Sequence, residues 1–136
     1  MKKLLGLILM AAALGGCAGT PSPAPGTQML VHLAQIEVYP QYLEEYLTYV
    51  RENGVASMTK EAGVIALYPV YEADRRDLVM VLEIYADEEA YQAHLNSAHF
   101  LKYKQGTLKM VKSLNIVDLG QISPELLPVT FKKASP

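Results

Sequence analysis

The apolar and polar positions of residues 29–122 follow two periods in turn, and this pattern predicts alternating strands and helices. Residues 29–38 and 64–71 are short runs rich in Leu, Val and Ile, which is typical of strands. Between these runs, apolar side chains recur at the i, i+3, i+4, i+7 spacing of an amphipathic helix: Leu43, Tyr46, Leu47 and Val50. The first part of this region therefore predicts a strand, a helix that begins at Pro40 and runs to about Lys60, and a second strand.

The second half repeats the alternation. Residues 74–77 are polar and predict a turn, and residues 78–85 predict a third strand that closes a β-hairpin. Asp87 and Ser97 are suitable N-caps for two helical pieces, one over residues 88–95 and one continuing through Tyr103 towards Val111. Residues 114–119 predict the last strand. The resulting order is β-α-β-β-α-β, a split βαβ arrangement with an antiparallel sheet and both helices on one face.

The third predicted strand is apolar on both of its faces. Val79 and Val81 alternate with Met80 and Leu82, so one pair can pack on the helices while the other pair needs a different cover. A sheet from a second copy of the chain is the simplest cover, and we therefore expect a homodimer.

Composition excludes several classes of protein. An apolar fraction of 51% and a charged fraction of 19% are typical of a globular domain, and a net charge of −2 argues against a nucleic-acid partner. One cysteine excludes an intramolecular disulfide and a Cys-x-x-Cys motif. The three histidines lack His-Glu-x-x-His spacing, and neither nucleotide-binding glycine motif is present. The sequence motifs therefore predict no metal and no cofactor.

The ends of the chain differ from its centre. Two lysines, an apolar run over residues 4–14 and Leu14-Gly15-Gly16-Cys17 predict a signal peptide over residues 1–16, with a resemblance to a bacterial lipobox. Cys17 is the predicted lipidation site, and the Pro-rich residues 17–28 form a tether to a domain over residues 29–122. Residues 123–136, interrupted by prolines, are expected to be an irregular tail. We expect a lipid anchor in the cell envelope, on the outer membrane facing the periplasm in a Gram-negative host.

The segment over residues 82–100 carries the most specific pattern, which ends in His94-Leu95-Asn96-Ser97-Ala98-His99-Phe100. Glu-x-Tyr, an acidic helix start and His-Leu-x-Ser-x-His-Phe, in this order, resemble the antibiotic biosynthesis monooxygenase (ABM) domain family. The resemblance extends more weakly over residues 29–122. It implies an α+β, ferredoxin-like βαββαβ fold that assembles as a dimeric α/β-barrel, with a pocket between sheet and helices in each subunit.

The resemblance implies a range of activities, because the family includes cofactor-free oxygenases of quinols and polycyclic phenols, haem-degrading enzymes and an isomerase. The haem activity is not expected here: aligned on Ser97 and Phe100, the iron-ligand position falls on Lys104, and the chain has no tryptophan. We expect a cofactor-independent monooxygenase that acts on a quinol or phenolic small molecule. The alternatives are a non-catalytic lipoprotein that binds a small molecule and an isomerase-type member of the family.

Two residues are the predicted catalytic groups. His94 shares a helical stripe with Tyr91 and Leu95, so it should point inward and serve as a base near neutral pH. Glu83 is the one charged residue within the apolar run of residues 78–85 and should orient a histidine or a tyrosine, or accept a proton. A core histidine bonded to a carbonyl is the alternative for His94, and an ion pair or hydrogen bond that organises the dimer or the next helix is the alternative for Glu83.

The wall of the predicted pocket is formed by polar and aromatic residues: Tyr46, Tyr68, Tyr85, His99 and Gln35. Ordinary packing is the alternative for the tyrosines, and helix capping or interface packing is the alternative for His99. The sequence pattern does not decide which face of its strand His32 occupies.

Overall fold

The computed structural model describes residues 28–134, and Cys17 lies outside this range. Four antiparallel strands form one sheet in the order β2-β3-β1-β4. The elements in chain order are β1 (Leu30–Val38), η1 (Pro40–Tyr42), α1 (Leu43–Lys60), β2 (Val64–Glu72), β3 (Arg75–Tyr85), α2 (Glu88–Leu95), α3 (Ala98–Thr107), β4 (Val111–Leu119), η2 (Pro124–Leu126) and α4 (Leu127–Ala134).

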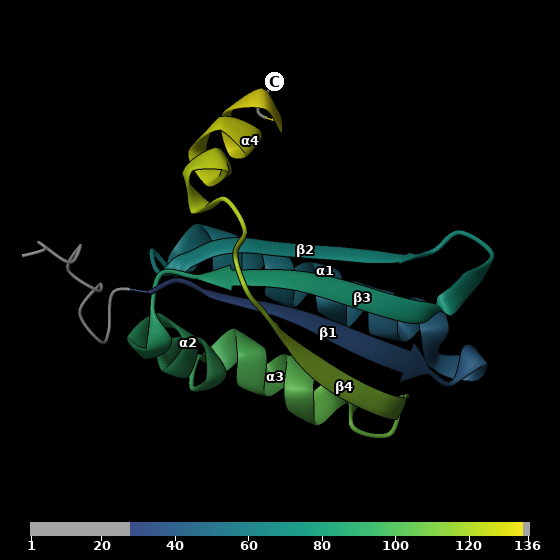
Figure 1. The fold of residues 1–136 in the computed structure, drawn as a ribbon. Coiled ribbons are helices and arrows are strands. Elements are labelled where there is room, and N and C mark those ends of the chain that lie inside the picture. Colours follow the sequence, from purple (N-terminus) through teal and green to yellow (C-terminus); the bar gives the residue numbers. More distant parts are fainter. Residues whose placement is uncertain (1–27, 135–136) are drawn as a thin grey trace, which may run out of the picture.

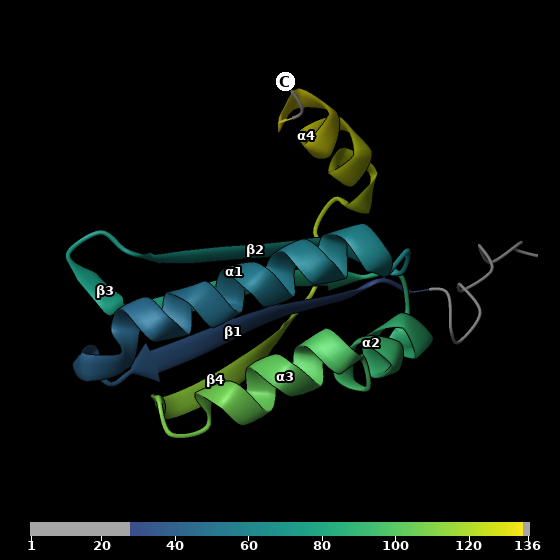
Figure 2. The same ribbon diagram turned by 180° about the vertical axis from the view of Figure 1, so that it is seen from behind.

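The sheet is a single layer with α1, α2 and α3 on one face, as the two opposite views in Figures 1 and 2 show. The side chains that fill the space between this face and the helices are buried, among them Ile36, Val38, Tyr46, Val79 and Met110. Because side chains alternate along a strand, the neighbours of these residues point to the opposite face. The predicted α+β, ferredoxin-like βαββαβ order is confirmed.

Three predicted boundaries were wrong. β3 begins at Arg75 rather than Leu78, because Glu72 pairs with Arg75 and a two-residue turn is enough to close the hairpin. α3 ends at Thr107, before the predicted limit near Val111, because Val111 already pairs with Val38 in the sheet. β4 accordingly starts three residues before the predicted start at Leu114.

The C-terminal segment is more regular than its prolines predicted. It contains η2 and α4, and each of Pro124 and Pro128 stands in a first turn, where a missing backbone N–H costs nothing. The expectation of an irregular tail was therefore wrong for residues 124–134.

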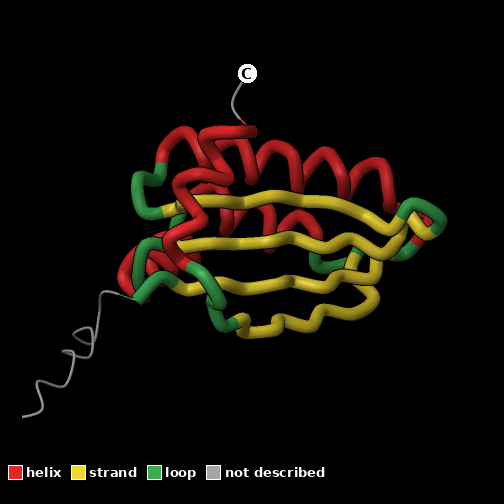
Figure 3. The backbone as a smooth tube through the Cα atoms, turned by 45° about the horizontal axis from the view of Figure 1, so that its top comes forward, coloured by secondary structure: helices red, strands yellow, loops and turns green. Residues whose placement is uncertain are grey.

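The face of the sheet opposite α1–α3, called the open face below, has one apolar row that crosses all four strands: Tyr68, Leu82, Leu33 and Val117. The chain leaves β4 and passes in front of this face on its way to α4 (Figures 1 and 3). A groove of about 810 Å³ separates the C-terminal segment from the sheet, with Ile84 and Leu126 among its walls. The open face is therefore covered at one end only, and Tyr68 stays 64% exposed. No helix within residues 28–134 has the length and apolar character to cross a membrane.

Candidate active site

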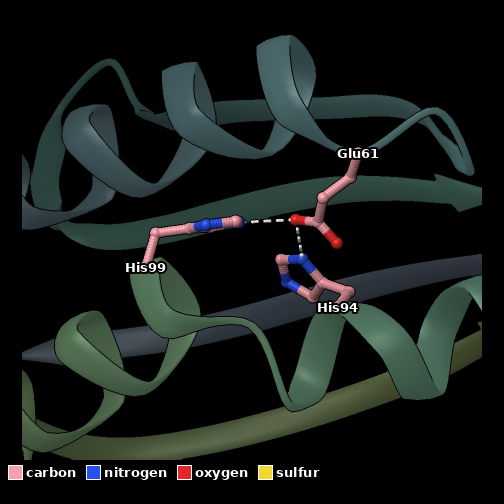
Figure 4. A group of neighbouring side chains, drawn as sticks. All are labelled: Glu61, His94 and His99. Carbon is pink, nitrogen blue, oxygen red and sulfur yellow. Dashed lines mark hydrogen bonds and ion pairs between the residues drawn. The ribbon is translucent and has the colours of Figure 1, made fainter.

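Two histidines and a glutamate meet on the helix side of the sheet. Oε1 of Glu61 lies 2.9 Å from Nδ1 of His94 and 2.5 Å from Nε2 of His99. Figure 4 shows both imidazoles directed at the same carboxylate oxygen, each from a different helix. We call Glu61, His94 and His99 the Glu–His–His cluster.

Three local structures position these side chains. Glu61 is the C-cap residue of α1, His94 lies in the last turn of α2, and His99 lies in the first turn of α3. α2 begins because the carboxylate of Asp87 accepts a hydrogen bond from the backbone N–H of Ala90 at 2.8 Å. α3 begins because Oγ of Ser97 accepts one from the N–H of Phe100 at 3.3 Å. The same Oγ lies 3.1 Å from Nε2 of His99. The two caps therefore direct both imidazoles towards Glu61.

The cluster is largely removed from solvent. The His94 side chain is 2% exposed, and the side chains of Glu61 and His99 are 14% and 15% exposed. Burial opposes the ionisation of Glu61, but the hydrogen bonds from His94 and His99, together with their electrostatic attraction, outweigh it and lower the pKa of this carboxyl. Glu61 is thus an anion at neutral pH. When one nitrogen of a neutral imidazole donates its N–H to this carboxylate, the other nitrogen of the same ring keeps a free lone pair.

Glu83 belongs to a second polar group on the same side of the sheet. The hydroxyl of Tyr85 donates a hydrogen bond to Oε2 of Glu83 at 3.1 Å. Burial raises the pKa of Glu83, and the hydrogen bond from Tyr85 offsets only part of this shift. Burial and the neighbouring charge of Glu83 also raise the pKa of Tyr85, so its hydroxyl keeps its proton. The ring of Tyr85 lies 5.4 Å from that of His94 and connects the two groups.

The predicted site residues divide between the two faces of the sheet. His94, Glu83, Tyr85, Tyr46 and His99 lie on the helix side, where the hydroxyl of Tyr46 bonds that of Tyr103 at 2.7 Å.

Tyr68 and Gln35 do not join them. Tyr68 lines the groove on the open face, and Gln35 is exposed and accepts a hydrogen bond from the amide of Asn115 at 2.9 Å. The sequence predicted that Tyr68 and Gln35 share a pocket with His94. Side chains alternate between the two faces along β2 and β1, and this alternation places both residues on the face opposite His94. His32 lies on the helix side, 7% exposed, with Nε2 at 3.4 Å from Asp118.

Glu61 is the functional candidate that the sequence patterns missed. The partner expected for His94 was Glu83 or a tyrosine, whereas the carboxylate that contacts it is Glu61, which is 33 positions away in the chain. One signal was available: Glu61 follows directly on a helix, and a helix C-terminus disfavours an anion. A carboxylate at such a position suggests that it has another partner.

A cavity of about 330 Å³ lies between α1 and α3 and reaches the cluster through His99. Its other polar walls include Asn53, Lys102 and Tyr103. Oδ1 of Asn53 is buried and has no hydrogen-bond partner within residues 28–134. His99 lines this cavity and His94 does not, so His99 is the imidazole that a molecule bound there would meet first.

The chain is similar to proteins of one family. Residues 29–106 match the model of a family described as antibiotic biosynthesis monooxygenase, and no curated protein matches the chain. A structure from Bacteroides thetaiotaomicron, named as a candidate antibiotic biosynthesis monooxygenase, is 46% identical with a TM-score of 0.68, and the match covers 69% of this chain and 90% of that one.

Two more distant structures have a similar fold. A candidate monooxygenase from Lactobacillus acidophilus is 26% identical with a TM-score of 0.67, over 71% of this chain and 46% of that one. A candidate antibiotic biosynthesis monooxygenase from Nitrosomonas europaea is 22% identical with a TM-score of 0.67, over 73% of this chain and 94% of that one. The residues matched by the family model include the whole Glu–His–His cluster and Glu83.

Proposed function

The chain belongs to the antibiotic biosynthesis monooxygenase family, and from this membership we propose that it is a cofactor-independent monooxygenase of a quinol or phenolic small molecule, anchored in the cell envelope. The observation that carries the proposal is the Glu–His–His cluster beside the cavity between α1 and α3. A cavity of about 330 Å³ lies within the range of roughly 300–1,000 Å³ that is usual for small-molecule sites.

The cluster supplies a base at the cavity wall. When Nε2 of His99 donates its proton to Glu61, Nδ1 keeps a lone pair that can accept the proton of a phenolic hydroxyl. His94, bonded to the same carboxylate oxygen, holds Glu61 in place from the buried side. His99 is therefore the proposed catalytic base, and His94, for which the sequence predicted this role, is proposed as a positioning residue.

The proposed reaction balances with dioxygen as the oxidant. The phenolate or quinolate passes an electron to dioxygen, the resulting radicals combine to form a carbon–oxygen bond, and loss of water from the peroxide leaves a quinone. A phenol with a free ring position thus gains one oxygen atom, the second oxygen atom leaves as water, and the substrate supplies all four electrons. Asn53 also lines this cavity, and its side-chain amide can form a hydrogen bond with a second hydroxyl, as a quinol would require.

Oxygen uptake in the presence of a reduced quinone tests this proposal. The full chain should consume oxygen and yield a product that contains one added oxygen atom. His99→Gln should lower the rate by about 10²–10⁴-fold, the usual contribution of a positioned base. Tyr68→Phe, on the open face, is the matched control and should retain the wild-type rate.

Three other outcomes decide between the alternatives. Saturable binding without oxygen uptake would support a non-catalytic binding protein. A product of unchanged mass would support an isomerase. A larger loss of rate in His94→Gln than in His99→Gln would return the role of base to His94.

The envelope location rests on the lipobox-like residues 14–17 and the Pro-rich residues that follow. Signal cleavage before Cys17 and acylation of its sulfur would leave the folded domain tethered at a membrane surface. The wild-type chain should therefore appear in the membrane fraction of expressing cells, and Cys17→Ser should not. Oxygen uptake by the same Cys17→Ser chain is the control for folding. A Cys17→Ser chain that still sediments with membranes would contradict the anchor.

A further inference from the structure

We propose that the Glu–His–His cluster is a binding site for one divalent transition-metal ion of the Zn²⁺ class, with Oε1 of Glu61, Nδ1 of His94 and Nε2 of His99 as its protein ligands. This inference goes beyond the proposed oxygenation and does not depend on it. It rests on the identity, position and charge of the three groups.

The ligand types and their spacing suit such an ion. The three ligand atoms lie within 4.8 Å of one another and come from the C-cap of α1, from α2 and from α3. Zn²⁺ binds imidazole nitrogen and carboxylate oxygen at about 2.0–2.2 Å, which places neighbouring tetrahedral ligands about 3.4 Å apart. The two distances from Glu61 are 2.9 and 2.5 Å, so small side-chain rotations would make room for an ion. Two histidines with one carboxylate form a donor set that also leaves coordination positions open.

The surroundings of Glu61 favour a bound cation, because hydrogen bonds alone do not neutralise the charge of a buried carboxylate. The side chain of Glu61 is only 14% exposed, and a carboxylate charge is costly in such a place unless a positive charge compensates for it. No lysine or arginine within residues 28–134 forms an ion pair with Glu61. Oγ of Ser97, at 3.1 Å from Nε2 of His99, adds a fourth polar atom, an oxygen, at the edge of the cluster. His99, at the cavity wall, gives the ion a path from solvent.

Binding of the ion would change which nitrogen of His99, the proposed base, carries the proton. A metal on Nε2 of His99 displaces the proton that this nitrogen donates to Glu61, and a neutral ring then carries its proton on Nδ1. Nδ1 thereby loses the lone pair that the proposed reaction needs. The ion and the catalytic role of His99 are therefore mutually exclusive, and the metal should inhibit.

Calorimetric titration of the full chain with Zn²⁺ tests the inference, after treatment with EDTA. We expect one ion per chain and a higher melting temperature with Zn²⁺. Glu61→Gln keeps the size of the side chain but removes its charge, and His99→Gln removes one ligand. Each should weaken binding by more than about 100-fold, since outer-shell changes alone cost about 10–100-fold. His32→Gln is the matched control, because this imidazole is also buried but lies outside the cluster.

A measurement on the wild-type chain covers the case in which a variant does not fold. X-ray absorption of its Zn²⁺ complex should show two imidazoles at about 2.0–2.1 Å. A lack of saturable binding, a complex without imidazole ligands, or an affinity for Zn²⁺ that stays at the wild-type value in both Glu61→Gln and His99→Gln would each overturn the inference. If Zn²⁺ binds as expected but no oxygen uptake is found under any condition, the metal site stands and the proposed oxygenation fails.

Discussion

Two glutamates on the same side of the sheet show how neighbours decide the state of a carboxyl group. Glu61 receives hydrogen bonds from two imidazoles, and these lower its pKa in spite of burial. Glu83 receives one hydrogen bond, from the hydroxyl of Tyr85, and burial raises its pKa. The first residue is thus suited to hold positive partners, and the second is suited to keep a proton.

We predict that Glu83→Gln stabilises the protein at pH 8. With a raised folded-state pKa, the folded chain holds the proton of Glu83 while the unfolded chain loses it above about pH 4.3. The contribution of Glu83 to stability is thus fully present below that pH and is lost as the pH rises through its folded pKa. Glutamine still accepts from Tyr85 without a charge, so the free energy of unfolding should exceed that of wild type by about 1 kcal/mol.

Thermal melts between pH 4 and 8 check this prediction. The melting temperature of Glu83→Gln should exceed that of wild type by roughly 4–8 °C at pH 8 and should differ little from it at pH 4. Glu52→Gln is the control, because Glu52 is exposed and pairs with Lys102 on the surface at 2.7 Å. A Glu83→Gln protein that is less stable than wild type at every pH would show that Glu83 is an ionised structural partner instead.

At the level of elements, the cluster depends on how closely α2 approaches the start of β2. Gly63 lies two residues after Glu61, and its backbone carbonyl accepts a hydrogen bond from the N–H of Ala86 at 2.9 Å. A Cβ added at Gly63 would overlap Cβ of Ala90 in α2. Glycine is therefore required here by the close packing of a helix on the chain that enters the sheet.

We predict that Gly63→Ala destabilises the protein by about 1–3 kcal/mol, the usual cost of an extra carbon in a tightly packed contact. Chemical denaturation measures this directly. Gly120→Ala is the matched control, because no atom lies within 4 Å of a Cβ at that position. Equal stability of Gly63→Ala and wild type would mean that α2 can shift outward without loss, which would also weaken the case for a fixed Glu61–His94 distance.

At the level of the whole molecule, the sheet is covered by helices on one face only. The open face carries the apolar row of Tyr68, Leu82, Leu33 and Val117, and the C-terminal segment covers one end of it. Apolar surface of this kind costs free energy in water, and burial against a second copy removes it. Members of this family are often homodimers that bind small molecules, which agrees with burial of the open face against a second copy of the chain.

We predict that the chain forms a dimer through the open face. Light scattering at micromolar concentration should report twice the mass of one chain, and Tyr68→Glu should reduce it to that of a monomer. Tyr68 is 64% exposed in the single chain, so its replacement should leave the fold intact. Leu108→Glu is the control, because Leu108 is 69% exposed but follows α3, on the helix side of the sheet. A stable wild-type monomer at this concentration would contradict the prediction.

The sequence by itself was sufficient for the order of the elements, for the inward direction of His94 and for the family, because these depend on local spacing: period 2 in strands, period 3.6 in helices and one contiguous motif. It did not predict the helical C-terminal segment, since a proline in a first turn looks the same in sequence as one that ends a helix. The carboxylate partner of His94 and the separation of Tyr68 and Gln35 from it were decided only by the tertiary structure. Such contacts join residues far apart in the chain, and they depend on which face of the sheet each side chain occupies once the helices have packed on it.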